Sequence, residues 1–478
     1  MPLQKGKSNR FLKDSFFIFI IRFFPSLANL LVLLYYSHNL ARPVYGTYQN
    51  FWIQLNFIYP FACLGIHALI ITYSPAFVII LAQRIKKSKI VLYGIWVLLL
   101  AGGFAYMQQS SLNLNLFIPF LFLILFSANI IMESVLIVFK KFRELSVISL
   151  LFAAGYCWIH YVILQNGFSY QSLFLYLLVL TVLRTIICGV LLLINLPKFK
   201  GAEHTDGRQV EEVRKLWLHL GVYDILQIVF AGIDKFAVSI LLTSSLSAVY
   251  YNGSQNIPFL PLILSAAGSA VLIQMVKVDA TDERSTLIKM MNQLARVLSV
   301  IVFPIFFFLV FFRNEFFSVL LPDYAQSVPI FLACLLVIPV KAYSFTTVLQ
   351  KMHLGHIINK GAVLELVVAI LLMYPAYMWF GLPGLAGCFV VTTYFQAAYY
   401  LFHSAKALQT SVSSLLPYGD WLVKLIVFAV LAIGIHYIAA WQFTATVCLF
   451  LGALLTGCII LVSLYLEYKK QIKNGHLK

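Results

Sequence analysis

The chain has 478 residues, of which 62% are hydrophobic and only 11% are charged, and its mean hydropathy is +0.91. Soluble domains carry about 45–50% apolar and about 25% charged residues, so this composition excludes a soluble globular protein. It predicts an all-α polytopic membrane protein. A net charge of +17 could indicate nucleic-acid binding, but the distribution of the basic residues along the chain favours membrane orientation instead.

About fourteen apolar segments are long enough to cross a bilayer as helices. They lie at residues 16–37, 50–73, 90–106, 116–138, 145–164, 173–195, 217–242, 248–274, 297–312, 327–349, 361–380, 384–404, 425–440 and 443–466. The first is too long for the core of a signal peptide, and no small-residue cleavage site follows it, so we expect it to be a spanning helix.

Basic residues gather in alternate loops and at both ends of the chain. The exceptions among the 34 Lys and Arg residues are Arg42 and Arg313 in the intervening loops and Arg22, Arg184, Lys235 and Lys341 inside expected spans. By the positive-inside rule, both termini are expected in the cytoplasm. The basic loops are then expected to contact anionic membrane lipids, and no nucleic-acid partner is expected.

The chain divides into two similar halves. A shift of 203 residues aligns Tyr48 with Tyr251, and each half contains six expected spans. The expected architecture is a six-helix lobe at 1–196, a cytoplasmic linker at 197–216, a second six-helix lobe at 217–405, and an appended helix pair with a basic tail at 406–478. Amphipathic stretches at 209–220 and 287–297 are expected to lie on the cytoplasmic surface of the membrane.

Two of the expected spans carry polar residues at helical spacing. Residues 217–242 contain Asp224, Gln227, Asp234 and Lys235, and residues 248–274 contain Tyr251, Gln255, Pro258 and Ser265. A charged group facing lipid near a helix centre costs about 2.5–3.5 kcal/mol by insertion scales, so these stripes should face protein or trapped water. We interpret the two helices as walls of a hydrated cavity in a transporter, with Asp224 and Asp234 as positions for ion or proton coupling.

Four cations lie inside expected spans, where each needs a carboxylate, a carbonyl, water or an anionic substrate as its partner. They are Arg22, Arg184, Lys235 and Lys341, and the acidic candidates are Glu133, Asp224, Asp234 and Glu365. Structural alternatives remain open. Arg22 could extend to the cytoplasmic interface, Lys235 could pair with Asp234, and Arg184 could tie helices together.

Motifs of enzymes and metal sites give no competing signal. His353-x-x-His356 has a spacing that could suit a metal, but no third ligand lies nearby in the sequence. No nucleophile-elbow, phosphate-loop or zinc-protease motif occurs. We therefore expect no metal, no cofactor and no catalytic residues.

Several segments resemble bacterial polysaccharide flippases of the O-antigen type. Residues 40–70 contain Tyr45-Gly46-Thr47-Tyr48 and Leu64-Gly65, which are similar to an aromatic-Gly-x-Tyr motif and a Gly-containing turn around the family's second helix. Residues 232–269 resemble its helix seven–eight hairpin, and residues 320–331 and 381–396 resemble later hairpins. Gln274 departs from the family, where proline is frequent near that position, and this puts a shared kink in doubt.

The resemblance implies the fold of the multidrug/oligosaccharidyl-lipid/polysaccharide exporter superfamily, with two six-helix lobes around a central cavity that alternates between the two sides. The implied activity is transfer of a polyprenyl-pyrophosphate-linked oligosaccharide across the bacterial cytoplasmic (inner) membrane, with polysaccharide-assembly proteins as further partners. The pyrophosphate needs cations, for which Arg22, Arg184, Lys235 and Lys341 are the candidates. Asn29, Asn56, Tyr251 and Gln255 could bind the glycan.

Two alternatives stay open. A cation-coupled drug antiporter of the same superfamily should favour acidic and aromatic cavity walls, so the intramembrane cations count against it. A membrane polysaccharide polymerase or transferase should need a sizeable external loop with catalytic side chains, and the outer loops are short. The longest of them, residues 313–326, offers little room for a catalytic site.

Overall fold

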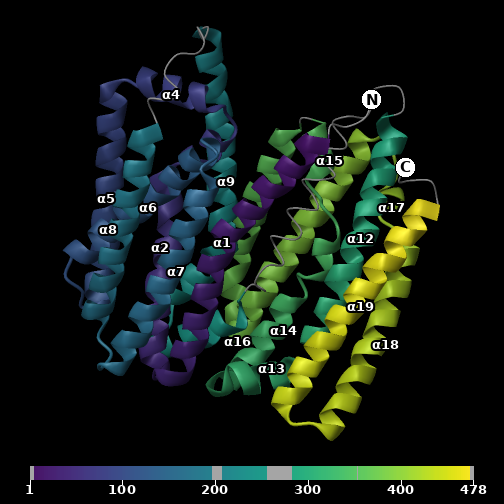
Figure 1. The fold of residues 1–478 in the computed structure, drawn as a ribbon. Coiled ribbons are helices and arrows are strands. Elements are labelled where there is room, and N and C mark those ends of the chain that lie inside the picture. The colour runs from purple at the N-terminus through teal and green to yellow at the C-terminus, as the bar shows by residue number, and fades with distance from the viewer. Residues whose placement is uncertain (1–4, 196–206, 256–282, 353, 474–478) are drawn as a thin grey trace. The chain divides into compact units, whose positions relative to one another are not determined.

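The computed structural model describes residues 5–195, 207–255, 283–352 and 354–473, and every regular element in that part of the chain is a helix (Figure 1). Ten stretches there are long and apolar enough to cross a membrane, and one of them, Gly355–Ala407, reverses direction at Gly381 and holds two passes. The all-helical polytopic class is therefore confirmed. Residues 256–274 of the expected eighth span lie outside the described residues, as does His353.

Contacts divide the chain into two units, Met1–Ala248 and Val249–Lys478. The first unit contains α1 (Lys5–Asn39), α2 (Arg42–Cys63), α3 (Ile66–Ile71), α4 (Pro75–Arg84), α5 (Lys87–Leu112), α6 (Phe117–Val138), α7 (Phe142–Gln165), α8 (Tyr170–Asn195) and α9 (Gly207–Leu241). Helix α10 (Ser244–Gly253) crosses the boundary. The second unit contains α12 (Glu283–Phe311), α13 (Arg313–Leu320), η3 (Pro322–Ser327), α14 (Val328–Leu335), η4 (Pro339–Ala342), α15 (Thr347–Lys351), α16 (Gly355–Ala407), α17 (Val412–Leu415), α18 (Tyr418–Gln442) and α19 (Ala445–Lys473).

Helix α2 is the centre of the first unit and packs against α5, α6 and α9. Its first turn carries Pro43, whose missing amide hydrogen leaves no unsatisfied donor there. The helix ends at Cys63 because Leu64 (φ 47°) and Gly65 (φ 65°) both adopt the left-handed conformation. The expected span 50–73 is thus interrupted, and the chain continues from Gly65 into the short helix α3.

Helix α9 runs unbroken for 35 residues, so residues 207–216 of the expected linker are its first turns. The remainder of the linker, residues 197–206, lies outside the described residues. Val213 is buried, and Trp217 donates a hydrogen bond from Nε1 to the Leu64 carbonyl at 2.8 Å. The second lobe was expected to begin at residue 217, whereas the contacts place the boundary between the two units after Ala248. The difference is α9, which belongs to the first unit because it packs along α2 and α3.

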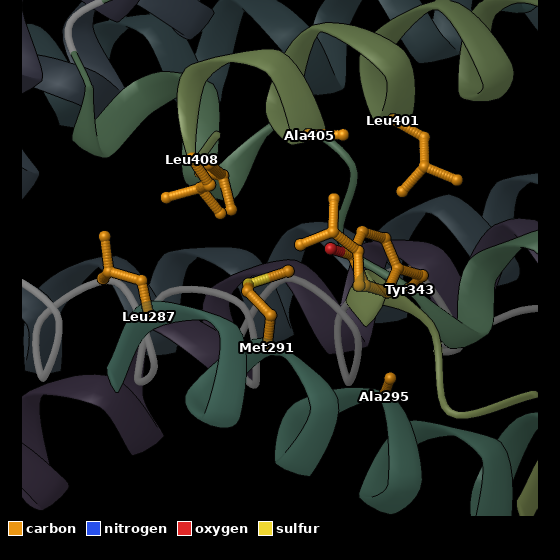
Figure 2. Packing of buried hydrophobic residues seen from close by; sticks show 9 residues of the cluster. Leu287, Met291, Ala295, Tyr343, Leu401, Ala405 and Leu408 are labelled. Carbon is orange, nitrogen blue, oxygen red and sulfur yellow. The ribbon is translucent and has the colours of Figure 1, made fainter. Parts of the chain in front are cut away.

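The second unit is built around α12, which packs against η4, α18 and α19. Leu287 and Met291, whose apolar face was expected on the membrane surface, are fully buried instead (Figure 2). They pack with Tyr343, Leu401 and neighbouring residues of α15, α16 and α17. The prediction of a surface helix at 287–297 is therefore wrong, because one apolar stripe serves a protein core as well as a lipid interface.

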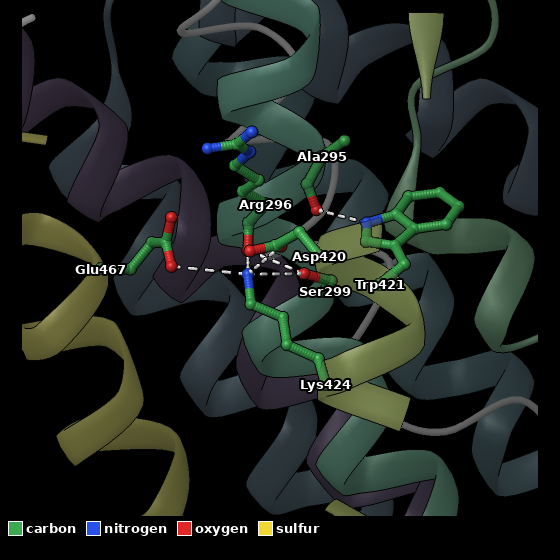
Figure 3. A network of polar contacts seen from close by, with 7 residues as sticks. All are labelled: Ala295, Arg296, Ser299, Asp420, Trp421, Lys424 and Glu467. Atoms are coloured by element: carbon green, nitrogen blue, oxygen red, sulfur yellow. Dashed lines mark hydrogen bonds and ion pairs between the residues drawn. The ribbon is translucent and has the colours of Figure 1, made fainter. Parts of the chain in front are cut away.

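The appended helices α18 and α19 are fixed to α12 by polar contacts (Figure 3). The Lys424 ammonium group lies 2.6 Å from Asp420 and 3.4 Å from Glu467 of α19, and it donates hydrogen bonds to the Arg296 carbonyl and the Ser299 hydroxyl. Further along α18, His436 lies 3.0 Å from Glu315. One lysine thus joins three helices at a single level.

Candidate functional site

Helices α2 and α9 form a close antiparallel pair whose ends meet at glycines. A Cβ atom on Gly46 would lie 1.8 Å from the Ser244 carbonyl oxygen, and one on Gly65 would lie 2.2 Å from the Gly221 Cα atom. Between these points the rings of Phe57 and Phe236 stack with centroids 3.8 Å apart. The backbone thus approaches as closely as glycine alone permits at two points, where Gly46 of α2 meets the first residue of α10 and where Gly65 meets Gly221 of α9.

Polar side chains occupy the same seam. Gln54 accepts a hydrogen bond from Gln108 of α5 at 2.6 Å and donates to the Ser239 hydroxyl of α9 at 3.4 Å. Beyond the break at Gly65, His67 Nε2 lies 3.2 Å from the carboxylate of Asp224. Asp224, expected as an ion or proton site, is therefore paired with His67, a residue that no sequence pattern singles out.

Two of the intramembrane cations have acidic partners within the first unit. Arg184 of α8 contacts the Glu133 carboxylate of α6 at 2.6 Å, and its guanidinium lies 4.8 Å from the centre of the Phe152 ring. The Lys235 ammonium group lies 3.6 Å from the carboxylate of the adjacent Asp234, which is a loose ion pair. The lysine side chain is half-buried. Arg184 thus has a structural role in joining α6 and α8, whereas the charge of Lys235 is only partly engaged.

Three predicted ligands are exposed on the first unit. Arg22 and Asn29 lie on α1, seven residues and about two helical turns apart, and Asn56 lies on α2. None of their side chains has a hydrogen bond or ion pair with any residue in the described part of the chain. By register along the α2–α9 seam, Asn56 lies near the level of Lys235. No described residue therefore competes with a ligand for these groups.

In the second unit, Lys341 occupies a break in the expected span 327–349. The helix ends at Leu335, a single 3₁₀ turn follows at Pro339–Ala342, and α15 begins at Thr347. Lys341 is half-buried, and its ammonium group has no ion-pair partner among the described residues. Broken helices of this kind form substrate sites in membrane transporters, because the interrupted backbone exposes polar groups at membrane depth.

The two predicted glycan ligands of the second unit lie at the end of α10. Tyr251 is half-buried within the helix, and Gln255 follows its last turn, also half-buried. Pro258 and Ser265 of the same polar stripe lie outside the described residues. Glu365, the remaining acidic candidate, is 2% exposed on α16, so it lies in the interior of the second unit.

A buried polar network in the first unit has no counterpart in the sequence-based predictions. His160 Nδ1 lies 2.7 Å from the Tyr156 carbonyl, which can only accept, so this nitrogen carries the proton. In the neutral ring Nε2 then accepts from the Tyr48 hydroxyl at 2.9 Å, and that hydroxyl accepts from Tyr156 at 3.0 Å. The Tyr36 hydroxyl completes the cluster by donating to the His160 carbonyl at 3.2 Å. The spacing of Tyr156 and His160, one turn apart on α7, was the available signal.

The charged groups therefore fall into two classes. Those with acidic partners stabilise helix packing, while Arg22, Lys341 and in part Lys235 keep donors that no described residue engages and that can neutralise an anionic ligand. Among the described residues no three His, Cys, Asp or Glu side chains converge as a metal site would require.

The chain is similar in structure to solved transporters. It superposes on the lipid II flippase MurJ in an inward closed conformation with a TM-score of 0.63 and 14% sequence identity, covering 95% of this chain and 99% of that one. An inward-facing multidrug resistance MATE family transporter of the MOP superfamily superposes with a TM-score of 0.54 and 11% sequence identity. The match covers 80% of this chain and 94% of that one. A MATE structure in a bent conformation superposes with a TM-score of 0.50 and 13% sequence identity, covering 83% of this chain and 94% of that one. No family model matches the sequence, and no curated protein matches it either. The chain thus has the fold of multi-pass transporters and flippases.

Proposed function

We propose that this protein is a flippase that moves a polyprenyl-pyrophosphate-linked oligosaccharide across the bacterial cytoplasmic membrane for surface polysaccharide synthesis. The supporting observation is the pair of intramembrane cations without acidic partners in the described residues, Arg22 and Lys341, in a chain that shares nearly its whole fold with a lipid II flippase. An unpaired cation at membrane depth is unfavourable unless a ligand or water compensates it.

In this proposal the cations bind the pyrophosphate and the amides bind the sugars. Arg22 offers a planar fork of donors that suits phosphate oxygens, and Lys235 and Lys341 add point charges. Asn29, Asn56, Tyr251 and Gln255 supply hydrogen bonds to hydroxyl groups, and the polyprenyl chain stays in the bilayer. Both termini lie in the cytoplasm, and polysaccharide-assembly proteins consume the flipped product.

The test is reconstitution into vesicles with a fluorescent lipid-linked glycan whose outer-leaflet fraction is measured by accessibility to a quencher. Arg22→Gln and Lys341→Gln should each lower the initial flipping rate about tenfold or more, because a charge-assisted contact to phosphate is lost. Arg143→Gln removes an exposed arginine at the start of α7 and serves as the matched control. Equal rates in the control and in both variants would remove these cations from the mechanism.

A second candidate is a cation-coupled drug antiporter, favoured by the likeness to the two MATE structures and by the carboxylate of Asp224 beside His67. It predicts efflux of a cationic dye from vesicles carrying a proton or sodium gradient, with loss in Asp224→Asn. Dye efflux without flipping of the lipid-linked glycan would select this function over the first.

A further inference from the structure

The two arms of α16 carry basic side chains around a hollow of about 360 Å³ where the helix begins and ends. His356 and Lys360 come from the first arm, and Tyr399, His403 and Lys406 come from the second. Among the described residues that line the hollow, none carries a carboxylate. It uses none of the residues proposed above to bind cargo.

The helical spacing of the basic and aromatic residues places their side chains on the faces of the two arms that line the hollow. His356 and Lys360 are four residues apart, and Tyr399, His403 and Lys406 follow at intervals of four and three, so each set shares one helix face. The rings of Tyr399 and His403 lie with centroids 4.5 Å apart. These five side chains therefore present their donors together.

The arms are held at fixed separation next to the hollow. A Cβ atom on Gly361 would lie 2.3 Å from the ring of Tyr400, so the first arm approaches the second as closely as glycine allows. The Tyr400 hydroxyl donates to the Ile358 carbonyl at 2.8 Å, which ties the arms together two residues from Lys360. The hollow is built on rigid helix backbone.

The charge of the hollow is uncompensated within the described residues. Lys360 and Lys406 are exposed, and neither ammonium group has an ion pair or hydrogen bond there. A hollow of about 410 Å³ between α7 and α8 gives the contrast, because Arg143 at its rim is accompanied by Glu144. The α16 hollow alone of these two offers a purely positive binding surface.

Apolar side chains continue from the hollow along the same arms. Val363 and Val367, three and seven residues beyond Lys360, are about half exposed, and so is Phe402 on the second arm. A ligand with a negative head and hydrocarbon chains would thus meet donors first and apolar surface next. Basic pockets between spanning helices at a membrane surface are typical sites for anionic lipid headgroups.

We propose that this hollow binds the phosphate of an acidic phospholipid headgroup, with Lys360 and Lys406 as its principal ligands. The positive-inside distribution places this end of α16 at the cytoplasmic leaflet, where such lipids are available. The acyl chains lie along Val363, Val367 and Phe402.

The experiment measures binding of short-chain phosphatidylglycerol to the purified full-length protein by native mass spectrometry. Lys360→Gln/Lys406→Gln should weaken binding about 30-fold. Each of the two lysines contributes a binding free energy typical of a basic residue near an anionic membrane surface, and the double variant loses both contributions. Lys86→Gln/Lys87→Gln removes the same charge from two exposed lysines outside any described hollow and should leave binding unchanged. Lys360→Arg/Lys406→Arg should retain binding, which also checks that the altered protein folds.

Three results would overturn the proposal. Equal weakening in both Gln variants would mean attraction by net charge alone. Equal binding of phosphatidylcholine would mean an apolar groove without headgroup recognition. Inorganic phosphate that binds as tightly as the lipid and displaces it would assign the hollow to a soluble anion instead.

Discussion

The backbone contact at Gly46 allows a quantitative prediction about the aromatic-Gly-x-Tyr motif. Replacing Gly46 by Ala would bring the new Cβ atom to 1.8 Å from the Ser244 carbonyl oxygen, whereas ordinary contacts of a Cβ atom begin near 3.4 Å. The colliding group is backbone, so no side chain can rotate away, and α2 must move from the α9–α10 turn. The movement would also lengthen the hydrogen bond from Thr47 to the Ser244 hydroxyl, now 2.9 Å.

Overpacking of a close contact costs about 1–3 kcal/mol, and a clash with backbone belongs at the upper end of this range. For a unit of this size, about 3 kcal/mol corresponds to a fall of about 6–12 °C in the thermal midpoint. The assay is thermal unfolding of the detergent-purified protein, followed by tryptophan fluorescence. Flipping per folded molecule should change little, because the motif is assigned to packing.

Gly94→Ala is the matched control. Gly94 lies inside α5, and a Cβ atom there meets nothing within 4 Å. Alanine favours a helix over glycine by about 0.5–1 kcal/mol, so this variant should be neutral or slightly more stable. If Gly46→Ala and Gly94→Ala unfold at the same temperature, the close contact between Gly46 of α2 and Ser244 at the start of α10 is refuted.

Three further substitutions test the polar contacts, all by the same unfolding assay. Tyr48→Phe should lower stability by about 1–3 kcal/mol, since His160 Nε2 loses its buried donor. Arg184→Gln should cost about 2 kcal/mol, and adding Glu133→Gln should restore most of the loss, because the uncompensated carboxylate is then gone. Lys424→Met should cost a similar amount and should increase proteolysis between α18 and α19, whereas unchanged cleavage would contradict its role in joining the helices.

The sequence predicted the spanning helices well because a bilayer leaves the backbone few choices. Each apolar segment must satisfy its amide and carbonyl groups internally, so length and hydropathy alone indicate a helix. The same reasoning separates the spans 361–380 and 384–404 on either side of the reversal at Gly381. It could not find the break at Leu64 inside the expected span 50–73, because that break depends on a local left-handed conformation. Nor could it divide the amphipathic faces between lipid and protein, and for this reason Leu287 and Met291 were assigned to the membrane surface instead of the core.

The sequence indicates which charged and polar residues belong to the candidate site, but it does not indicate which of them contact one another. Periodicity selects Arg184 and Asp224 because each is charged within an apolar helix. It cannot indicate that Glu133, 51 residues away, meets Arg184, or that His67 across the Gly65 break meets Asp224. Long-range pairing is set by helix packing, to which a single sequence gives no direct access.

In the proposed function, the extent to which each cation is already paired determines how much it gains by binding the pyrophosphate. A cation that already contacts a carboxylate gains little from a phosphate, because the new contact replaces an existing one and leaves the carboxylate beside a second anion. Arg184 is in this position, and Lys235 shares it in part through the 3.6 Å contact with Asp234. Arg22 and Lys341 have no such contact in the described residues, so each would gain the full charge-assisted interaction on binding. The loss of flipping on neutralisation should therefore be largest at Arg22 and Lys341, intermediate at Lys235, and for Arg184 no larger than its loss of folded protein explains.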